Sequence, residues 1–266
     1  MPVARRRPAG VLLAALCVAA LCLAPTAGAS RWHPKPTTAA WQWQLQGRID
    51  TSVGAAVYEV DGFEVPGATV AKLHRLGRRV ICYLDVGSWE SYRPDAGRYP
   101  DAVLGRAYEG YPDERWLDIR RTDLLAPILR RRFDLCRSKG FDAVEPDNIA
   151  GYENKTGFPL SAGDQLRFNR WVAREVHRRG MAVALKNDPG QVGPLLASFD
   201  FAVVEECFAY DECGMFSPFV DAGKGVFVAE YTEPLAAICS PAERLRFSVI
   251  RKDYDLFARP WEPCVP

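Results

Sequence analysis

Residues 140–152 read Gly140-Phe141-Asp142-Ala143-Val144-Glu145-Pro146-Asp147-Asn148-Ile149-Ala150-Gly151-Tyr152. This stretch begins as an apolar run and ends in acids, an amide and a tyrosine. Such a pattern is typical of a buried strand that emerges into a polar environment at one end. In barrels built from alternating strands and helices, the carboxyl end of each strand is where catalytic residues lie. A fold of this kind requires other strands to bring polar groups to the same end.

Seven further segments have the alternation or the apolar character of strands. They are residues 41–46, 55–60, 79–86, 181–185, 201–204, 226–231 and 246–250. Helical spacing separates most of them, most clearly at 68–76, 122–139, 161–179 and 190–199. Alternating strands and helices predict a parallel sheet, and eight such units suit a chain of this length. We predict an α/β fold, a single-domain (β/α)8 TIM barrel over residues 41–266, with a doubly wound open sheet as the alternative.

The first 29 residues have the pattern of a secretory signal peptide. Arg5-Arg6-Arg7 precede an apolar run from Val11 to Leu23, and Ala27-Gly28-Ala29 fits a small-residue cleavage site. An apolar run of thirteen residues is too short to span a bilayer, which argues against a membrane anchor. We expect residues 1–29 to be removed, residues 30–40 to form an extended lead-in, and the mature protein to be secreted without membrane attachment. The export route stays open.

The charge balance of the mature chain does not suggest a nucleic-acid partner. Without residues 1–29, the chain has 31 basic and 33 acidic side chains, a formal net charge of −2. A nucleic-acid partner would require a basic patch that the sequence does not suggest. No G-x-G-x-x-G or P-loop motif is present, so we expect no nucleotide cofactor. We expect a monomer.

Six cysteines remain after the signal segment, and an even number in an exported protein indicates disulfides. Six cysteines allow fifteen pairings. Proximity in sequence favours Cys207–Cys213 and Cys239–Cys264, which leaves Cys82–Cys136 as the third pair. Metal binding is the alternative, but no C-x-x-C occurs and no histidine lies near these cysteines. We therefore expect no metal site.

Six of the predicted strands end in polar residues. These ends are Tyr83-Leu84-Asp85, Glu145-Pro146-Asp147-Asn148, Lys186-Asn187-Asp188, Glu205-Glu206, Glu230-Tyr231 and Lys252-Asp253. In a barrel, all of them meet at one mouth. A single acid in such a place is equally well explained as a helix cap or a surface charge. Six polar ends in succession predict a functional site.

Strand parity narrows the choice among these acids, because alternate residues of a strand face the same side. Parity alone does not say which face is inward, but small and acidic residues favour the face that carries Asp85, Asp147 and Glu205. We expect these three side chains to point into the mouth. The same parity turns Cys82 outward, toward Cys136 on the following helix.

Two carboxyl groups on opposite sides of the barrel mouth are typical of glycoside hydrolases. One protonates the leaving oxygen, and the other attacks the sugar or activates water. Aromatic side chains at this end could stack on sugars or simply pack the loops; these are Trp89, Tyr92, Tyr152, Phe208 and Tyr231. The aromatic-rich connection 88–121 is long enough to predict a functional role. No histidine is placed for serine hydrolysis. Lys186 could form a Schiff base or pair with the carboxylates.

Four motifs together resemble glycoside hydrolase family 114, the endo-α-1,4-polygalactosaminidases. They are Tyr83-Leu84-Asp85-Val86-Gly87-Ser88-Trp89-Glu90, the stretch from Gly140 to Tyr152, Leu185-Lys186-Asn187-Asp188 and Glu205-Glu206-Cys207. The resemblance covers residues 41–255 and implies a metal-free (β/α)8 barrel that cleaves α-1,4-linked galactosamine polymers. An acidic mouth would suit such a cationic polysaccharide partner.

The resemblance carries the catalytic pair onto Asp147 and Glu205, with Asp147 as nucleophile or base and Glu205 as proton donor, or the reverse. The residues expected to bind substrate are Tyr83, Asp85, Trp89, Glu145, Asn148, Tyr152, Lys186, Asn187, Glu206 and Tyr231. Ala150 and Val204 stand where the family often has an acid and an asparagine, so sugar contacts could differ there. A non-catalytic glycan-binding barrel and a Schiff-base enzyme using Lys186 remain alternatives.

Overall fold

The computed structural model of the protein describes residues 31–37 and 39–264. The predicted signal peptide, residues 1–29, therefore lies outside the described residues. Within them, no helix is both long enough and apolar enough to cross a membrane.

Parallel strands form the wall of a barrel and follow one another in chain order. They are β1 (Trp41–Gln44), β2 (Val57–Asp61), β3 (Arg79–Asp85), β7 (Ala143–Asp147), β8 (Ala182–Lys186), β9 (Phe201–Glu205), β10 (Val226–Glu230) and β11 (Ser248–Arg251). A short β12 (Glu262–Pro263) adds to β11 in the antiparallel direction. Because the spatial order never reverses, the predicted TIM barrel is confirmed and the doubly wound alternative is wrong.

The seam between the first and last parallel strands is closed by the C-terminal segment. The Leu45 amide donates to the Leu256 carbonyl at 3.0 Å. The Trp261 indole donates to the Trp41 carbonyl at 2.7 Å. These bonds tie β1 to the chain that follows β11, so the barrel is nearly closed.

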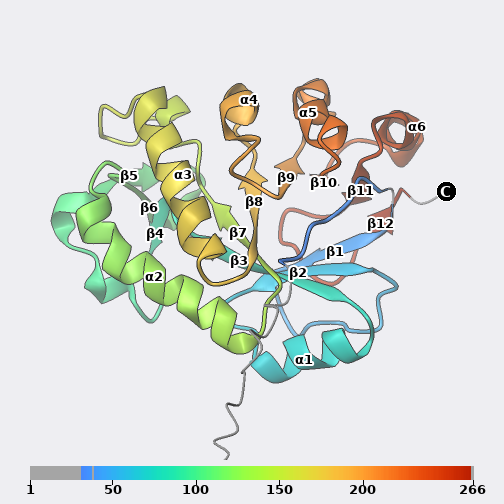
Figure 1. Ribbon diagram of the computed structural model, residues 1–266, viewed down its shortest axis with the longest axis horizontal. Helices are drawn as coiled ribbons and strands as arrows, with labels where there is room; N and C mark the ends of the chain where they lie inside the picture. The colour runs from blue at the N-terminus through green and yellow to red at the C-terminus, as the bar shows by residue number, and fades with distance from the viewer. Residues whose placement is uncertain (1–30, 38, 265–266) are drawn as a thin grey trace, which may run out of the picture. The chain divides into compact units, whose positions relative to one another are not determined.

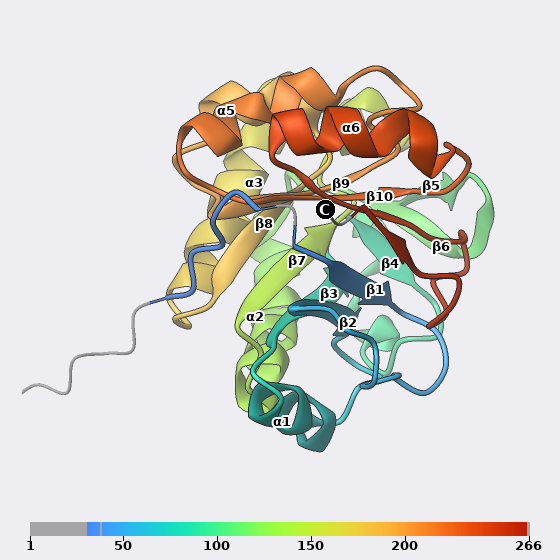
Figure 2. The same cartoon turned by 90° about the vertical axis from the view of Figure 1, so that its right-hand side faces the viewer.

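The helices lie outside the strands (Figures 1 and 2). They are α1 (Gly67–Arg75), α2 (Thr122–Lys139), α3 (Ala162–His177), α4 (Val192–Leu195), α5 (Ser217–Asp221) and α6 (Leu235–Leu245). Short 3₁₀ turns occur at η1 (Ala96–Arg98), η2 (Asp101–Val103), η3 (Gly151–Glu153), η4 (Pro189–Gln191) and η5 (Cys213–Phe216).

Local signals set the helix ends as the sequence predicts. Ser161 and Asp164 form the predicted capping box at the start of α3, and Gly140 ends α2 with a φ of 90°. The predicted helix 190–199 is shorter than expected, because only η4 and α4 form there. Gly193 and Pro194 are poor helix formers, which accounts for the shortening.

The long connection after β3 is not an irregular loop but a small antiparallel sheet. Its strands are β4 (Ser88–Glu90), β5 (Leu104–Tyr108) and β6 (Tyr111–Leu117), in the order β4-β6-β5. Arg132 of α2 holds this segment: it donates to the Asp85 carbonyl at 2.7 Å and pairs with Asp95 at 2.9 Å. The segment leaves the carboxyl end of β3 and therefore begins at the barrel mouth, although its Tyr99 and Trp89 pack into the outer apolar layer.

The barrel strands separate two apolar layers. The inner layer consists of Trp41, Trp43, Val57, Ile81, Ala143, Ala182, Ala184, Phe201, Val203, Phe227, Ala229, Ile250 and Leu256. Outward-facing strand residues pack with the helices in a larger second layer. Small alanines beside large aromatics fill the tapering interior. The apolar inner layer leaves little polar support for charged groups in the barrel, which must therefore partner one another.

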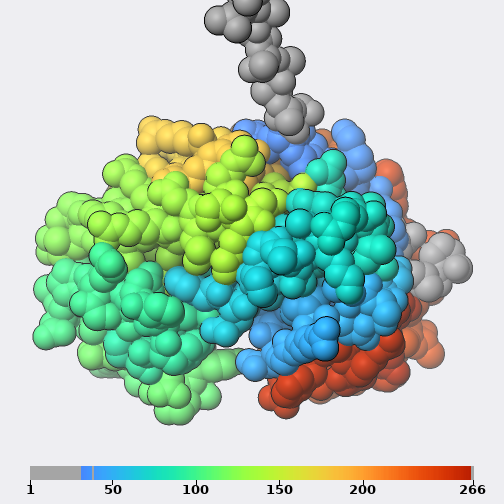
Figure 3. Space-filling view, turned by 90° about the horizontal axis from the view of Figure 1, so that it is seen from below, coloured from blue at the N-terminus to red at the C-terminus, as the bar shows by residue number. Residues whose placement is uncertain are grey.

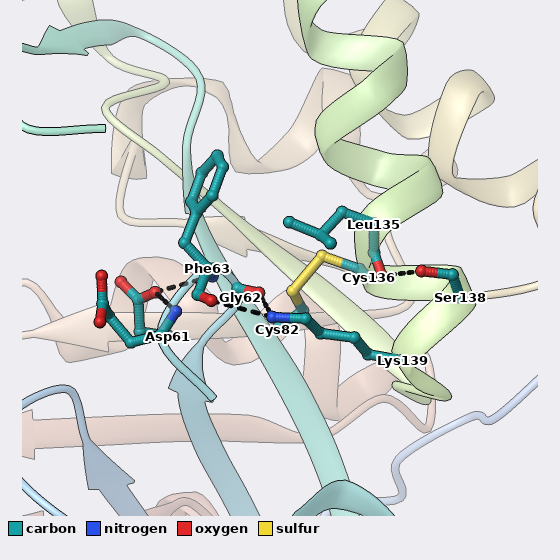
Figure 4. The surroundings of a disulfide bond; sticks show 9 residues. Asp61, Gly62, Phe63, Cys82, Leu135, Cys136, Ser138 and Lys139 are labelled. Carbon is teal, nitrogen blue, oxygen red and sulfur yellow. Dashed lines mark hydrogen bonds between the residues drawn. A yellow bond between two sulfur atoms is a disulfide. The ribbon is translucent and has the colours of Figure 1, made fainter. Parts of the chain in front are cut away.

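All three predicted disulfides are present, with Cα–Cα distances of 6.1 Å for Cys82–Cys136, 4.7 Å for Cys207–Cys213 and 5.1 Å for Cys239–Cys264. Cys82 points outward from β3 to Cys136 on α2, as parity predicts (Figure 4). Gly62 lies directly against this bond: a Cβ there would come within 2.5 Å of the Cys82 sulfur. A side chain at position 62 would therefore force the strand and the disulfide apart.

Candidate active site

Lys186, at the end of β8, lies at the centre of the predicted site. Its side chain is 3% exposed, and its ammonium nitrogen lies 2.6 Å from Glu145 Oε1, 3.0 Å from Asp147 Oδ1 and 3.1 Å from Glu205 Oε2. The same nitrogen sits 4.7 Å from the centre of the Trp43 ring. Three carboxylates from β7 and β9 thus share one cation.

The charge on Lys186 is held in place by these neighbours. Burial by itself would lower the pKa of Lys186, but Asp147, Glu145 and Glu205 outweigh it and raise that pKa well above its ordinary value. A Schiff base requires a neutral amine. The aldolase-like alternative for Lys186 is therefore not supported, and the ammonium acts as a bridge between acids.

Each predicted catalytic acid also accepts a hydrogen bond from a tyrosine. The Tyr83 hydroxyl donates to Asp147 Oδ2 at 3.0 Å, and the Tyr231 hydroxyl donates to Glu205 Oε1. Burial, and after it the neighbouring acid, raises the pKa of both tyrosines, so both remain donors. The side chains of Asp147 and Glu205 are 20% and 28% exposed, so a substrate can reach them.

The shared cation also limits the separation of the two acids. Asp147 Oδ1 and Glu205 Oε2 both lie within 3.1 Å of the same nitrogen, so they are no further apart than twice that distance. Retaining glycosidases hold their carboxyl groups about 5–5.5 Å apart, whereas inverting ones need about 6.5–9.5 Å to admit a water molecule. The bound applies to the two oxygens that contact Lys186, and an oxygen separation below it is compatible with the shorter spacing.

Backbone strain is concentrated where these strands end. Asn148, Asn187, Asp188 and Glu206 all have positive φ, between 48° and 60°. Such a conformation costs non-glycine residues on the order of 1–2 kcal/mol each. Side chains hold it: Asn187 Oδ1 accepts the Glu205 amide at 2.9 Å, and Asp147 Oδ1 accepts the Asn148 amide at 2.8 Å. The strain turns the chain sharply beside both acids, as functional sites often do.

Two other predicted substrate-binding residues lie at the mouth, on the loops that follow the strands. Glu206 accepts a hydrogen bond from the Tyr254 hydroxyl at 2.8 Å, and Tyr254 stacks on Tyr231 with ring centres 4.3 Å apart. Tyr152, on η3, donates to Asp188 Oδ1 at 3.3 Å. Burial is the main cause that raises the pKa of Asp188 to about 8.

Asp85 and Trp89 are not in the group around Lys186. Asp85 is buried, accepts the Ser88 amide at 2.6 Å and accepts the Asn148 side-chain amide at 2.6 Å. It thereby fixes the turn into β4. Trp89 packs against the outer apolar layer, and its indole donates to the Ala96 carbonyl at 3.1 Å. Substrate contact by these two residues stays a prediction.

Sequence reasoning missed Glu59 and gave no specific role to Tyr108 and Tyr111. Glu59 lies fully buried inside the barrel on β2; the signal was an acid in the middle of an otherwise apolar strand. Tyr108 and Tyr111 lie where β5 turns into β6. After burial, the strongest influences raising their pKa values are Asp147 for Tyr108 and Glu205 for Tyr111. The two tyrosines are therefore influenced by the charges of the predicted catalytic pair.

The surface is notched at the edge of this region. Figure 3 shows a hollow between the green surface of the β5–β6 segment and the blue and red surfaces of the segments that include β1 and β11. The exposed side chain of Tyr254 contacts Glu206, which directly follows β9 at the same end of the barrel.

One group of residues in the described chain has metal-ligand spacing: Cys207, Cys213 and Glu230. The two sulfurs are bonded to each other. Because cysteine binds a metal ion as a thiolate, these disulfide-bonded sulfurs do not fit a metal ion.

The fold and the site define a TIM-barrel glycoside hydrolase, since two reachable carboxyl groups face each other at the carboxyl ends of the strands. The family model described as glycoside-hydrolase family GH114 matches residues 23–265. The chain belongs to this family, which confirms the resemblance found in the motifs.

Solved structures agree with this assignment. The chain is similar to Aspergillus fumigatus Ega3, solved in complex with galactosamine, at 34% identity and a TM-score of 0.82, over 86% of this chain and 96% of that one. It is also similar to the glycoside hydrolase domain of PelA from Pseudomonas aeruginosa, at 12% identity and a TM-score of 0.65, over 82% and 95% of the two chains. The second likeness shows the fold alone. No curated protein sequence matches the chain.

Proposed function

We propose that the protein hydrolyses α-1,4-linked galactosamine-containing polysaccharides with Asp147 and Glu205 as its catalytic pair. The observation that carries the proposal is the bridging of these two acids by Lys186 at the mouth of a family GH114 barrel. The galactosamine bound in the related Ega3 supports the choice of sugar.

Asp147 is the better nucleophile of the two. It accepts hydrogen bonds from Lys186, Tyr83 and the Asn148 amide, and these three donors hold its carboxyl group in one orientation. Glu205 has two such donors at its side chain, Lys186 and Tyr231, and is more exposed. The greater exposure of Glu205 gives a leaving group access to it, so we assign it the role of the acid.

The spacing of the pair favours a retaining mechanism in two steps. Asp147 attacks the anomeric carbon while Glu205 protonates the departing glycosidic oxygen, which gives a covalent glycosyl-enzyme. Glu205, now a carboxylate, then removes a proton from water as the water attacks that carbon and releases Asp147. Each step leaves the pair with the same total charge, which the fixed ammonium of Lys186 balances.

The cleft is suited to a cationic sugar chain. Glu206 follows Glu205 in the chain and adds a carboxyl group at this mouth. Glu114 accepts a hydrogen bond from Ser88 at the start of β4, and burial is the main cause that raises its pKa to about 7, so it carries only part of a negative charge at neutral pH. An unacetylated galactosamine unit carries an ammonium group, whereas N-acetylgalactosamine does not. Carboxylates near the cleft attract the first more strongly.

Incubation with two polymers, galactosamine and N-acetylgalactosamine, tests the proposed function. We expect new reducing ends and a ladder of oligosaccharides from the polymer with free amines, and slower release from the fully acetylated one. Binding of the polymers without any new reducing ends would contradict hydrolysis and would identify a glycan-binding barrel instead.

We also propose that the mature protein is exported. The three disulfides support this, because such bonds persist in oxidising compartments, and the basic and apolar pattern of residues 5–23 supports it as well.

A further inference from the structure

Glu59 is a fully buried carboxyl inside the barrel that the proposed mechanism leaves unused. It lies on β2 directly across from Trp43 in the β1–β2 ladder and has no exposed surface. Neither of its oxygens accepts a hydrogen bond from an N–H or O–H donor among the described residues. A buried, ionised carboxylate without hydrogen-bond donors is strongly unfavourable. Glu59 is therefore expected to be protonated and neutral.

The carboxyl group of Glu145 also has an oxygen without a donor, so a hydrogen bond between Glu59 and Glu145 would provide a partner for both residues. Its Oε1 accepts the Lys186 ammonium at 2.6 Å, but its Oε2 is buried without a donor. Glu59 on β2 and Glu145 on β7 are both fully buried on the two strands that flank β3, and each carboxyl group influences the pKa of the other as a hydrogen-bonding neighbour. Two carboxylates cannot form that bond, whereas a single proton between them gives a partner to one oxygen of each residue.

We propose that Glu59 is a positioning residue that stays protonated and donates its proton to Glu145 Oε2. The resulting chain, from Glu59 through Glu145 to Lys186, fixes the ammonium between Asp147 and Glu205. The proposal rests on the proposed function, because its rate effects require the hydrolysis that this catalytic pair performs.

The neighbours of the two carboxyls place the proton on Glu59 rather than on Glu145. Burial, and then the Glu145 carboxylate, raises the pKa of Glu59 well above its ordinary value. Burial also raises the pKa of Glu145, but Lys186 and the hydrogen bond from Glu59 act in the opposite direction. Asp147 disfavours a negative charge on both. Only Glu145 has the ammonium in direct contact.

The position of Lys186 depends on this arrangement. Glu145 makes the shortest of the three contacts to the ammonium, and apart from that ammonium no donor among the described residues contacts its carboxyl group, which leaves Glu59 to fix its orientation. If Glu145 rotates, Lys186 moves, and with it both acids that it bridges. A displacement of about 1 Å in a catalytic group can reduce the rate by on the order of a hundredfold.

Two substitutions of Glu59 separate this role from simple packing. Glu59→Gln keeps the shape and supplies an amide N–H in place of the acid proton, whereas Glu59→Leu keeps similar volume and supplies no donor. We expect Glu59→Leu to lower kcat by about tenfold to a hundredfold with little change in KM. We expect Glu59→Gln to recover most of that loss and to keep the wild-type pH profile.

A spectroscopic readout tests the same proton without turnover. An infrared difference spectrum between the wild type and Glu59→Gln at neutral pH is expected to show the loss of one protonated-carboxyl band. This measurement stands even if Glu59→Leu does not fold. It also separates the two proposals, because a wild type that cleaves no galactosamine polymer overturns the proposed function and leaves the band unaffected.

Two results would overturn the role of Glu59. In one, Glu59→Gln is as slow as Glu59→Leu although both melt as the wild type does, which would mean that an ionised Glu59 is needed. In the other, the protonated-carboxyl band persists unchanged in Glu59→Gln, which would place the proton elsewhere.

Discussion

The acidic side chains at the two ends of the barrel differ in how they are partnered. At the amino end, Asp200 lies before β9 and has partners of its own: its Oδ2 contacts His177 at 2.8 Å and accepts the Val183 amide at 3.0 Å, and Arg31 lies 3.2 Å from Oδ1. At the carboxyl end, three carboxylates, those of Glu145, Asp147 and Glu205, share the ammonium of Lys186.

Asp142 repeats the arrangement of Asp200 at the start of β7. It contacts His74 at 2.8 Å, Arg79 at 2.6 Å and the Val80 amide at 2.8 Å. In both cases one carboxylate ties neighbouring strands to a helix. Acids at this end stabilise the barrel, as expected of the end opposite the catalytic one.

The pKa shifts follow the same division. Burial would raise the pKa of Asp200, but the hydrogen bond from His177 and its charge outweigh burial and lower it. At the other end, burial raises the pKa of Glu145 and, with Glu145, that of Glu59. Buried carboxyl groups with raised pKa values at one end of a stable barrel indicate the place where the chemistry occurs.

The largest effect should follow from removing either catalytic acid. We expect Asp147→Asn and Glu205→Gln to lower kcat/KM on a galactosamine polymer by about 10³-fold or more, because each amide keeps the shape but can neither attack nor donate a proton. Melting temperatures should stay close to the wild-type value. If either variant keeps near-wild-type turnover, the pair is assigned wrongly and the contrast between the two ends fails.

Replacing the bridge should have a smaller effect on the rate and a marked effect on stability. We expect Lys186→Met to lower kcat by about a hundredfold, since the acids lose their common anchor. The free energy of unfolding should fall by about 3–5 kcal/mol, because buried carboxylates are left without their cation. Lys186→Arg is the matched control: its planar guanidinium keeps the charge but not the three-way geometry. Full activity in Lys186→Met would contradict the bridging role.

At the amino end the effects should be reversed, with stability lost and the rate unchanged. We expect Asp200→Asn to lower the free energy of unfolding by about 1–3 kcal/mol and to leave kcat/KM within about twofold of the wild type. Since the folded pKa of Asp200 is lowered, its contribution is present above the unfolded pKa and disappears as pH falls through the folded value.

Melting curves across the acidic range check that sign. The wild type should lose more stability than Asp200→Asn as the pH falls, so that the two curves converge at low pH. A difference that is constant at every pH would mean that the charge of Asp200 contributes nothing.

The sequence was sufficient where periodic patterns control the structure. Eight strand segments predicted the barrel, and parity placed Cys82 against Cys136 and Asp147 and Glu205 at one mouth. The sequence was insufficient where contacts between distant segments determine the position of a side chain. Asp85 has the same parity as Asp147 on its strand, but the turn into β4 buries it, and no pattern in residues 79–86 reports that turn.

The same limit explains the other gaps. The antiparallel sheet in the 88–121 connection depends on Arg132, which is distant in sequence. The central place of Lys186 depends on the packing of β7, β8 and β9 side by side, which brings three acids to one nitrogen. The proton on Glu59 depends on a contact with Glu145 across the barrel interior.

The anomeric form of the first product tests the catalytic pair most directly. Proton NMR during the earliest phase of hydrolysis, before mutarotation, distinguishes the two anomers of the new reducing end. Because Asp147 and Glu205 share one ammonium, which is the basis of the retaining mechanism that we propose, the α-anomer should form first from the α-linked polymer. Initial release of the β-anomer would contradict a nucleophilic Asp147 and the bridged site.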